Sequence, residues 1–230
     1  MKTLGLIGGT TWVSTIDYYR LINKQINERL GGLNSARMLL YSVNFAEFNP
    51  PTDPAEWGGL TGKFIEIAQT LQKAGADCIV FCANTPHLIS DPVQKNINVP
   101  IIHIAEETAK VIAESQLRKV GLLGTRITME QSFYKDKLLQ YGITTLIPEY
   151  EERCFIHSSI LDEMAKDIFK EETRERYLRI ITKLVQEGAE AIVLGCTEIP
   201  ILIKQKDSPV PLFDTTLIHA SAIVNFALSN

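Results

Sequence analysis

Two of the four cysteines lie at matching places in the chain, each where an apolar run stops. Cys82 follows residues 78–81 and Cys196 follows residues 191–195. A thiolate can accept a proton near neutral pH and a thiol can donate one. Two such groups acting on opposite faces of one carbon would invert it, because one removes a proton while the other supplies one. The residues therefore predict that Cys82 and Cys196 are an acid/base pair, whereas Cys78 and Cys154 pack as small apolar side chains.

Three segments recur in the same order in the two halves of the chain. Residues 4–11 match 120–128, residues 74–82 match 187–196, and residues 99–102 match 210–213. Continuous apolar strands alternating with helices are typical of parallel sheets covered on both faces. We predict an α/β fold of two pseudo-symmetric parallel-sheet lobes, the first formed by residues 1–101 with 207–230 and the second by residues 102–206. Ligands bind at the carboxyl ends of such strands, so the active site is expected in the cleft between the lobes.

Helices fill the intervals between the predicted strands. Apolar residues recur at helical spacing over residues 64–71 and 177–185, and each stripe ends at a glycine, Gly75 or Gly188. Ser14 or Thr15 is expected to cap a helix that runs to about Gly31, and Thr128 to cap another that runs to about Tyr141. His157 is expected to cap a helix as well.

The overall composition excludes several classes of protein. The chain has 230 residues, of which 45% are hydrophobic and 22% charged, with a formal net charge of −4. These values are typical of a folded globular protein, and the scattered basic residues argue against nucleic acid as a partner. The apolar runs are too short to cross a membrane. Four cysteines without an export signal predict reduced thiols and a cytoplasmic location.

The motifs in their order resemble the aspartate/glutamate racemase family, a family of PLP-independent amino-acid racemases. The likeness covers nearly the whole chain and is carried by Cys-Ala-Asn-Thr-Pro-His at 82–87, Gly-Cys-Thr-Glu-Ile-Pro at 195–200 and Gly-Gly-Thr-Thr-Trp at 8–12. The resemblance implies catalysis by Cys82 and Cys196 without a cofactor, an amino-acid substrate and a homodimer. It also implies that the substrate's α-carboxylate and amino group are held by Asn84, Thr85 and Thr197, with Thr10 and Thr125 completing the pocket.

One departure from the family concerns substrate specificity. Aspartate racemases of this family tend to carry an arginine in the loop after the second strand, but residues 41–62 contain no Lys or Arg. Phe48 and Thr52 sit where such a partner is expected, and Thr52 is retained as a substrate-binding candidate. The side-chain carboxylate of an acidic substrate would then be bound by Lys166 of the other lobe. Lys166 can equally be a solvated helix lysine. Aspartate, glutamate or a broader set of amino acids remain alternatives.

Other readings of the same residues stay open. A small-molecule binding or sensor protein would also have two lobes, and hydantoin racemase, maleate isomerase and arylmalonate decarboxylase reuse cysteine at the same strand ends. We expect His87 to orient the first cysteine loop, while Glu198 could orient or tune Cys196 although a carboxylate raises a thiol pKa. The sequence has no metal-ligand spacing and no nucleotide-binding glycine loop, so no metal or cofactor is expected.

Overall fold

The computed structural model describes residues 1–48 and 54–229, which form two compact units. Unit 1 consists of Met1–His103 and the C-terminal residues from His219, and unit 2 consists of Ile104–Ile218. Each unit contains a parallel sheet with helices, which confirms the predicted α/β fold of two similar lobes. None of the described helices is long and apolar enough to cross a membrane.

The sheet of unit 1 has three strands in the order β2-β1-β3. These strands are β1 (Thr3–Gly8), β2 (Arg37–Ser42) and β3 (Cys78–Phe81), and all pairings are parallel. A single bridge from Ile79 to Ile101 extends the sheet beyond β3. All four β3 residues are buried, as expected for a strand covered on both faces.

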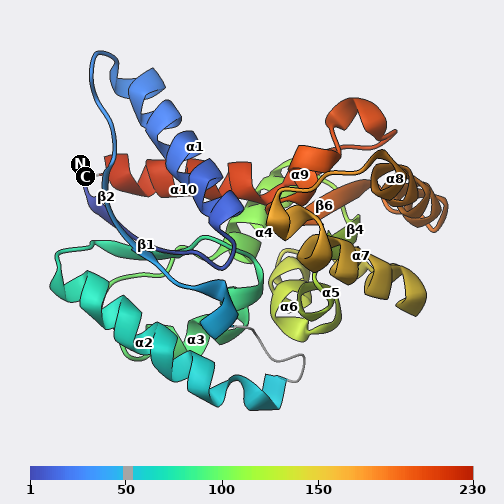
Figure 1. The fold of residues 1–230 in the computed structure, drawn as a ribbon. Helices are drawn as coiled ribbons and strands as arrows, with labels where there is room; N and C mark the ends of the chain where they lie inside the picture. The colour runs from blue at the N-terminus through green and yellow to red at the C-terminus, as the bar shows by residue number, and fades with distance from the viewer. Residues whose placement is uncertain (49–53, 230) are drawn as a thin grey trace. The chain divides into compact units, whose positions relative to one another are not determined.

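Helices cover both faces of this sheet (Figure 1). On one face, Tyr18, Ile22 and Ile26 of α1 (Trp12–Leu30) pack with Leu4 and Leu6, together with the part of α10 (Thr215–Leu228) that belongs to unit 1. The opposite face is covered by α2 (Gly58–Lys73) and α3 (Ser90–Gln94). Three short 3₁₀ helices complete the unit: η1 (Phe45–Glu47), η2 (Pro54–Trp57) and η3 (Thr85–Ile89).

Unit 2 repeats this arrangement with one further strand, in the order β5-β4-β6-β7. Its parallel strands are β4 (Lys119–Gly124), β5 (Thr144–Leu146), β6 (Ala191–Gly195) and β7 (Leu212–Asp214). The longer helices are α4 (Ile104–Glu114), α6 (Ser132–Gln140), α7 (Tyr150–Asp162) and α8 (Glu171–Gln186). The shorter ones are α5 (Arg126–Glu130), α9 (Ile199–Leu202), η4 (Met164–Lys166) and η5 (Gln205–Asp207).

The structure differs from the sequence expectations at the crossing between the units and at three helix starts. The expectation divided the chain at residue 207, whereas β7 pairs with β6 of unit 2 and the division lies at residue 218. Thr11 caps α1 in place of Ser14 or Thr15, and Thr125 caps α5 in place of Thr128. His157 lies inside α7 and so does not cap that helix. In both capped helices the hydroxyl that precedes the helix accepts a free N–H group of the first turn, so the true cap stands earlier in the chain than expected.

Candidate active site

A glycine turn follows β1 in unit 1. Gly9 has φ +83°, and a Cβ atom there would clash with the backbone of Val43, so a side chain at this position is excluded on two grounds. The Gly9 N–H donates to Thr15 Oγ1 at 2.8 Å, and Thr11 Oγ1 accepts from the Ser14 N–H. The next residue, Thr10, has a buried Oγ1 atom that no described group hydrogen-bonds. The turn thus places a hydroxyl beside the first turn of α1.

Cys82 follows β3, on the neighbouring strand of the same sheet. Its N–H donates to the Ile7 carbonyl at 2.9 Å, which continues the β1–β3 ladder by one residue. Its own carbonyl accepts from Ser14 Oγ at 3.2 Å. The backbone of Cys82 is therefore held by β1 on one side and by α1 on another. The side chain is fully buried, and burial raises the pKa of its thiol.

The residues after Cys82 form a buried loop held by His87. Nδ1 of the His87 ring lies 2.9 Å from the Ala83 carbonyl, so this nitrogen carries the proton and donates. Asn84 is 3% exposed, and its carbonyl accepts the His87 N–H. Thr85 begins η3 immediately afterwards. This arrangement agrees with an orienting role for His87, because the ring fixes the main chain next to Cys82.

Three histidine rings pack together behind this loop. The His87 ring centroid lies 4.7 Å from that of His103 and 5.6 Å from that of His219. His219 bonds through Nδ1 to the Tyr18 hydroxyl at 2.7 Å and through Nε2 to the Ile102 carbonyl at 2.8 Å. Burial lowers the pKa of His87 to about 4 and that of His219 to about 3. Both rings are therefore neutral near pH 7.

The matching edge of unit 2 carries Thr125 and Cys196. Gly124 of β4 and Gly195 of β6 are direct partners in the sheet, so the residues that follow them leave the sheet on adjacent strands. A Cβ atom on Gly195 would lie 2.8 Å from the Leu123 carbonyl oxygen, which is too close for a side chain. Thr125 Oγ1 accepts the Thr128 N–H and lies 3.1 Å from Thr128 Oγ1.

Cys196 has a charged partner. Its Sγ donates to Glu198 Oε2 at 3.0 Å, and Thr197 Oγ1 donates to the same oxygen at 2.7 Å. Cys196 is 8% exposed and Glu198 only 1%. Burial and the adjacent Glu198 carboxylate together raise the pKa of the Cys196 thiol. The thiol and the carboxylate form one buried pair at the carboxyl end of β6.

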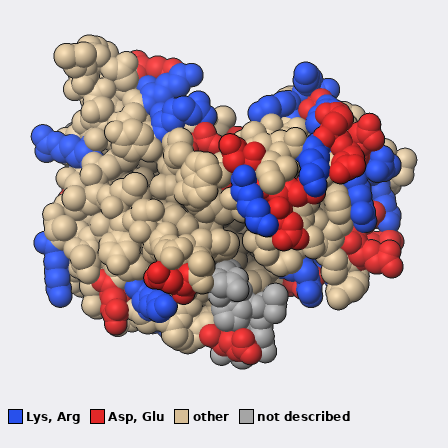
Figure 2. All heavy atoms as spheres, in the orientation of Figure 1, with Lys and Arg blue, Asp and Glu red and all other residues tan. Residues whose placement is uncertain are grey.

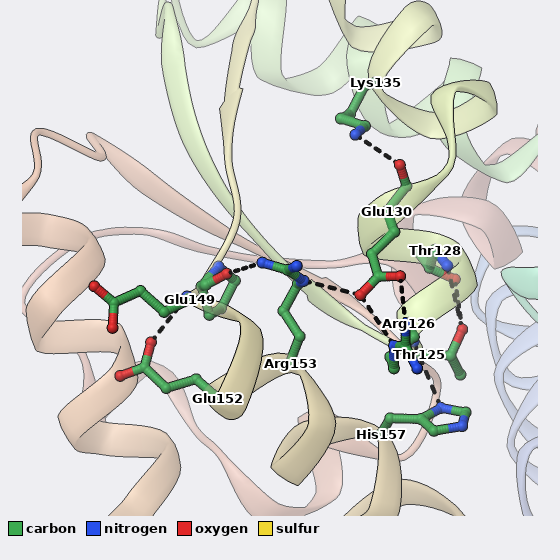
Figure 3. A network of polar contacts seen from close by, with 10 residues as sticks. Thr125, Arg126, Thr128, Glu130, Lys135, Glu149, Glu152, Arg153 and His157 are labelled. Atoms are coloured by element: carbon green, nitrogen blue, oxygen red, sulfur yellow. Dashed lines mark hydrogen bonds and ion pairs between the residues drawn. The ribbon is translucent and has the colours of Figure 1, made fainter.

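A second polar network lies beside Thr125, and Figure 3 shows Arg126 and Arg153 both directed at the Glu130 carboxylate. Arg126 makes two bonds of 3.0 Å to Glu130, and Arg153 Nε makes one of 3.0 Å. Partial burial raises the pKa of Glu130, but the bonds to the two arginines outweigh this effect and lower it. His157 Nδ1 accepts the Arg126 N–H at 3.5 Å, so α7 reaches the turn that carries Thr125.

The predicted substrate-binding residues divide into three groups. Thr10, Asn84 and Thr85 lie with Cys82 at the carboxyl edge of the unit 1 sheet, while Thr125 and Thr197 lie with Cys196 at that edge in unit 2. Lys166 is exposed at the end of η4, and its ammonium makes no hydrogen bond or ion pair within residues 1–48 and 54–229. Thr52 lies outside the described residues.

Two features of the site escaped sequence reasoning. Ser14 reaches the Cys82 carbonyl over 68 positions of sequence, a contact that no local pattern indicates. The Arg126–Glu130 pair could have been found, because an arginine and a glutamate four residues apart lie on one side of a helix. Its link to Arg153 depends on how α5 and α7 pack, which the sequence does not reveal.

The chain matches one known family over nearly its full length. The sequence model of the Asp/Glu/hydantoin racemase family matches residues 7–223. The chain belongs to this family. A curated relative is the broad specificity amino-acid racemase RacX of Bacillus subtilis, which is 23% identical over 98% of both chains. The predicted family resemblance is thereby confirmed.

Solved structures agree in fold. A Yersinia pestis protein classed with the Asp/Glu racemases is 43% identical, with a TM-score of 0.91 and full coverage of both chains. An aspartate racemase homologue from Pyrococcus horikoshii is 38% identical, with a TM-score of 0.85 and equal coverage. Glutamate racemase from Francisella tularensis is 16% identical with a TM-score of 0.70, covering 98% of this chain and 80% of its own, and shares the fold.

Proposed function

We propose that the protein is a cofactor-independent amino-acid racemase in which Cys82 and Cys196 exchange protons with the α-carbon. The observation that carries this proposal is the equivalent placement of the two thiols. Each directly follows a strand that pairs in parallel with the first strand of its own sheet, β3 beside β1 and β6 beside β4. Family membership and the racemase relatives support the same activity.

The proposed reaction needs one thiolate and one thiol. The thiolate takes the α-proton, so an S–H bond forms and the C–H bond breaks. The electron pair of the broken bond stays on the α-carbon, which becomes a carbanion. The other thiol then gives its proton to the opposite face of the α-carbon. The electron pair of its broken S–H bond stays on the sulfur, which becomes a thiolate. For this chemistry the threonine hydroxyls and amides at Thr10, Asn84 and Thr197 would hold the amino acid.

The substrate class is an amino acid of acidic or broader type. Relatives include both a broad specificity racemase and an aspartate racemase homologue. Arg126, the basic residue nearest Thr125 in the chain, already makes two bonds to Glu130. Lys166 makes no such bond among the described residues, so it retains the capacity to bind a side-chain carboxylate.

Chiral chromatography tests the proposal directly. Purified protein is incubated with single enantiomers of aspartate, glutamate and several neutral amino acids, without PLP, and with a hydantoin as a comparison. We expect at least one amino acid to be inverted from either enantiomer, and the activity to survive both EDTA and hydroxylamine. Inversion of the hydantoin alone would place the activity elsewhere in the family. Inversion of nothing, by a protein that binds amino acids, would favour a binding function.

A further inference from the structure

The two cysteine loops share a proline but differ in the residue two places after the cysteine. Counting from the cysteine, both loops carry proline at the fourth place after it, Pro86 in unit 1 and Pro200 in unit 2. The second place holds the neutral amide Asn84 in unit 1 and the carboxyl residue Glu198 in unit 2. The repeat therefore matches an amide in the first loop with a carboxylate in the second.

The carboxylate acts on the Cys196 sulfur at short range. The Sγ to Oε2 separation is 3.0 Å, and both residues are nearly removed from solvent, so water does little to screen their interaction. A thiol can donate to this oxygen, whereas a thiolate in its place would face a like charge and lose the hydrogen bond. The Thr197 hydroxyl holds the same oxygen at 2.7 Å and so fixes the acceptor.

Other titratable groups near the pair do not replace Glu198. Tyr177 of α8 is buried and bonds to Ser159 Oγ at 3.1 Å, and burial raises its pKa, so the phenol stays neutral. Glu163, after α7, bonds to Lys170 and Thr173 at 2.9 and 2.7 Å. Its charge is thus compensated locally, and Glu198 is the carboxylate that the Cys196 thiol contacts.

We propose that Glu198 keeps the exchangeable proton on Cys196, which makes Cys196 the proton donor and Cys82 the proton acceptor of the resting enzyme. This inference rests on the proposed racemase function and adds which thiol carries the proton before an amino acid binds. Burial disfavours the thiolate of Cys82, but the ammonium group of a bound amino acid would offset that effect. At Cys196 the opposing group is the protein's own Glu198, whose Oε2 lies 3.0 Å from the sulfur. Glu198 is a positioning residue that acts through the thiol.

Alkylation by iodoacetamide measures the thiol directly, because the thiolate is the reacting form. The rate at Cys196 is followed against pH by peptide mass spectrometry in the wild type, E198Q and E198D. We expect the midpoint for Cys196 to fall by about one pH unit or more in E198Q, which is about a tenfold rise in thiolate below the midpoint. E198D keeps a carboxylate and should stay near the wild type. Cys154 in the same digest serves as the internal control, with an unchanged profile.

A second readout uses racemisation itself. Loss of the required acid at high pH sets the alkaline limb of kcat/KM, and this limb should move to lower pH in E198Q by the same interval. The shift must be equal from both enantiomers, since the equilibrium constant between them is one. A wild type without racemase activity would refute the proposed function and leave the alkylation result intact.

An unshifted midpoint at Cys196 in E198Q would overturn the inference and leave the racemase proposal standing. Should E198Q fail to fold, E198N provides the same test, because it copies the amide that unit 1 carries at Asn84. A change in the limiting alkylation rate without a change in midpoint would show altered access to the thiol. That result would also count against the inference.

Discussion

At the scale of single residues, the two matched thiols stand out from the other cysteines by what surrounds them. Cys82 and Cys196 each follow a strand and are each followed by buried polar residues, whereas Cys78 lies within β3 and Cys154 within α7. All four are free thiols. Burial that raises a thiol pKa favours a proton donor, and a racemase needs one donor for every acceptor. The residues therefore suit proton transfer better than attack on an electrophile.

Replacing each thiol tests that assignment. Cys82→Ala and Cys196→Ala should each abolish inversion from both enantiomers, because every turnover needs one acid and one base. Chiral chromatography of the products measures the loss. Cys154→Ala, which removes a half-buried thiol from the middle of α7, is the matched control and should retain most of the activity. Substantial activity in either strand-end variant would contradict the two-thiol mechanism.

The repeat in the sequence was enough to predict where the two cysteines lie, while their catalytic role stays a prediction. The repeat predicts that each cysteine follows a buried parallel strand, and Cys82 follows β3 while Cys196 follows β6. The Cys196–Glu198 bond was harder to foresee, since residues two apart after a strand can point in many directions. The sequence could not assign a role to Lys166. The structure leaves this side chain exposed to solvent, so its position does not assign one either.

At the scale of elements, the glycine turn after β1 determines where α1 begins. Gly9 takes a left-handed backbone conformation and passes close to Val43, which brings the loop after β2 against the turn. The same turn allows Thr11 to cap α1 and Ser14 to reach the Cys82 carbonyl. The turn at Gly9 therefore brings the ends of β1, β2 and β3 together at the start of α1.

Two glycines with similar φ values allow backbone strain to be distinguished from steric crowding. Gly31 has φ +71° and open space where a Cβ would stand, whereas Gly9 has φ +83° and a backbone clash. Gly31→Ala should cost about 1–3 kcal/mol, because φ +71° with ψ −174° is a backbone conformation almost confined to glycine. Gly9→Ala should cost at least about 2 kcal/mol more, since the Val43 backbone must move. Urea unfolding of both variants measures the difference, and equal losses would show that the turn adapts freely.

The element order was predictable because apolar periodicity and glycine stops are local signals. The stripe over residues 64–71 lies in α2 and that over residues 177–185 in α8, as predicted. The strand 212–214 was harder, because the short segment after Pro211 carries no sign of which sheet it joins. Hydrogen bonding of the Ile192 N–H to the Pro211 carbonyl commits it to unit 2. That contact is set by the packing of segments distant in sequence.

At the scale of the whole molecule, charge and buried histidines set the response to pH. Figure 2 shows Lys and Arg side chains interspersed with Asp and Glu on the face drawn, so neither sign of charge covers that face.

Inside unit 1, the His87, His103 and His219 rings join η3, the end of the first chain segment and α10. The bond from His219 to the Ile102 carbonyl alone spans 117 positions of sequence, so the cluster connects distant parts of the chain.

Protonation of this cluster should destabilise the protein in mild acid. The unfolded chain takes up protons near pH 6.5, whereas folded His87 and His219 resist until about pH 4 and about pH 3. The unfolded state therefore binds more protons below pH 6.5, and the free energy of unfolding falls as the pH falls. Each ring should contribute a loss of about 2 kcal/mol between about pH 7.5 and about pH 5.

Urea unfolding at the two pH values checks this expectation. His219→Gln lowers stability at neutral pH but should show a smaller loss on acidification than the wild type, because one titrating ring is gone. His157→Gln is the matched control, since that ring is only half-buried and should account for less of the pH dependence. An equal loss in the wild type and His219→Gln would show that other groups control acid stability.

The last expectation concerns how the whole enzyme handles the transferred proton. If one base served both faces, the proton it removed could return to either face and exchange with solvent before inversion. With two thiols on separate sheets, the proton removed stays on one sulfur and the proton delivered comes from the other, which has exchanged with solvent. In D₂O the product enantiomer should carry deuterium at the α-carbon from the first turnovers, while recovered substrate stays protonated. Mass spectrometry of both enantiomers at early times measures this, and deuterium appearing in the substrate as fast as inversion would favour a single base.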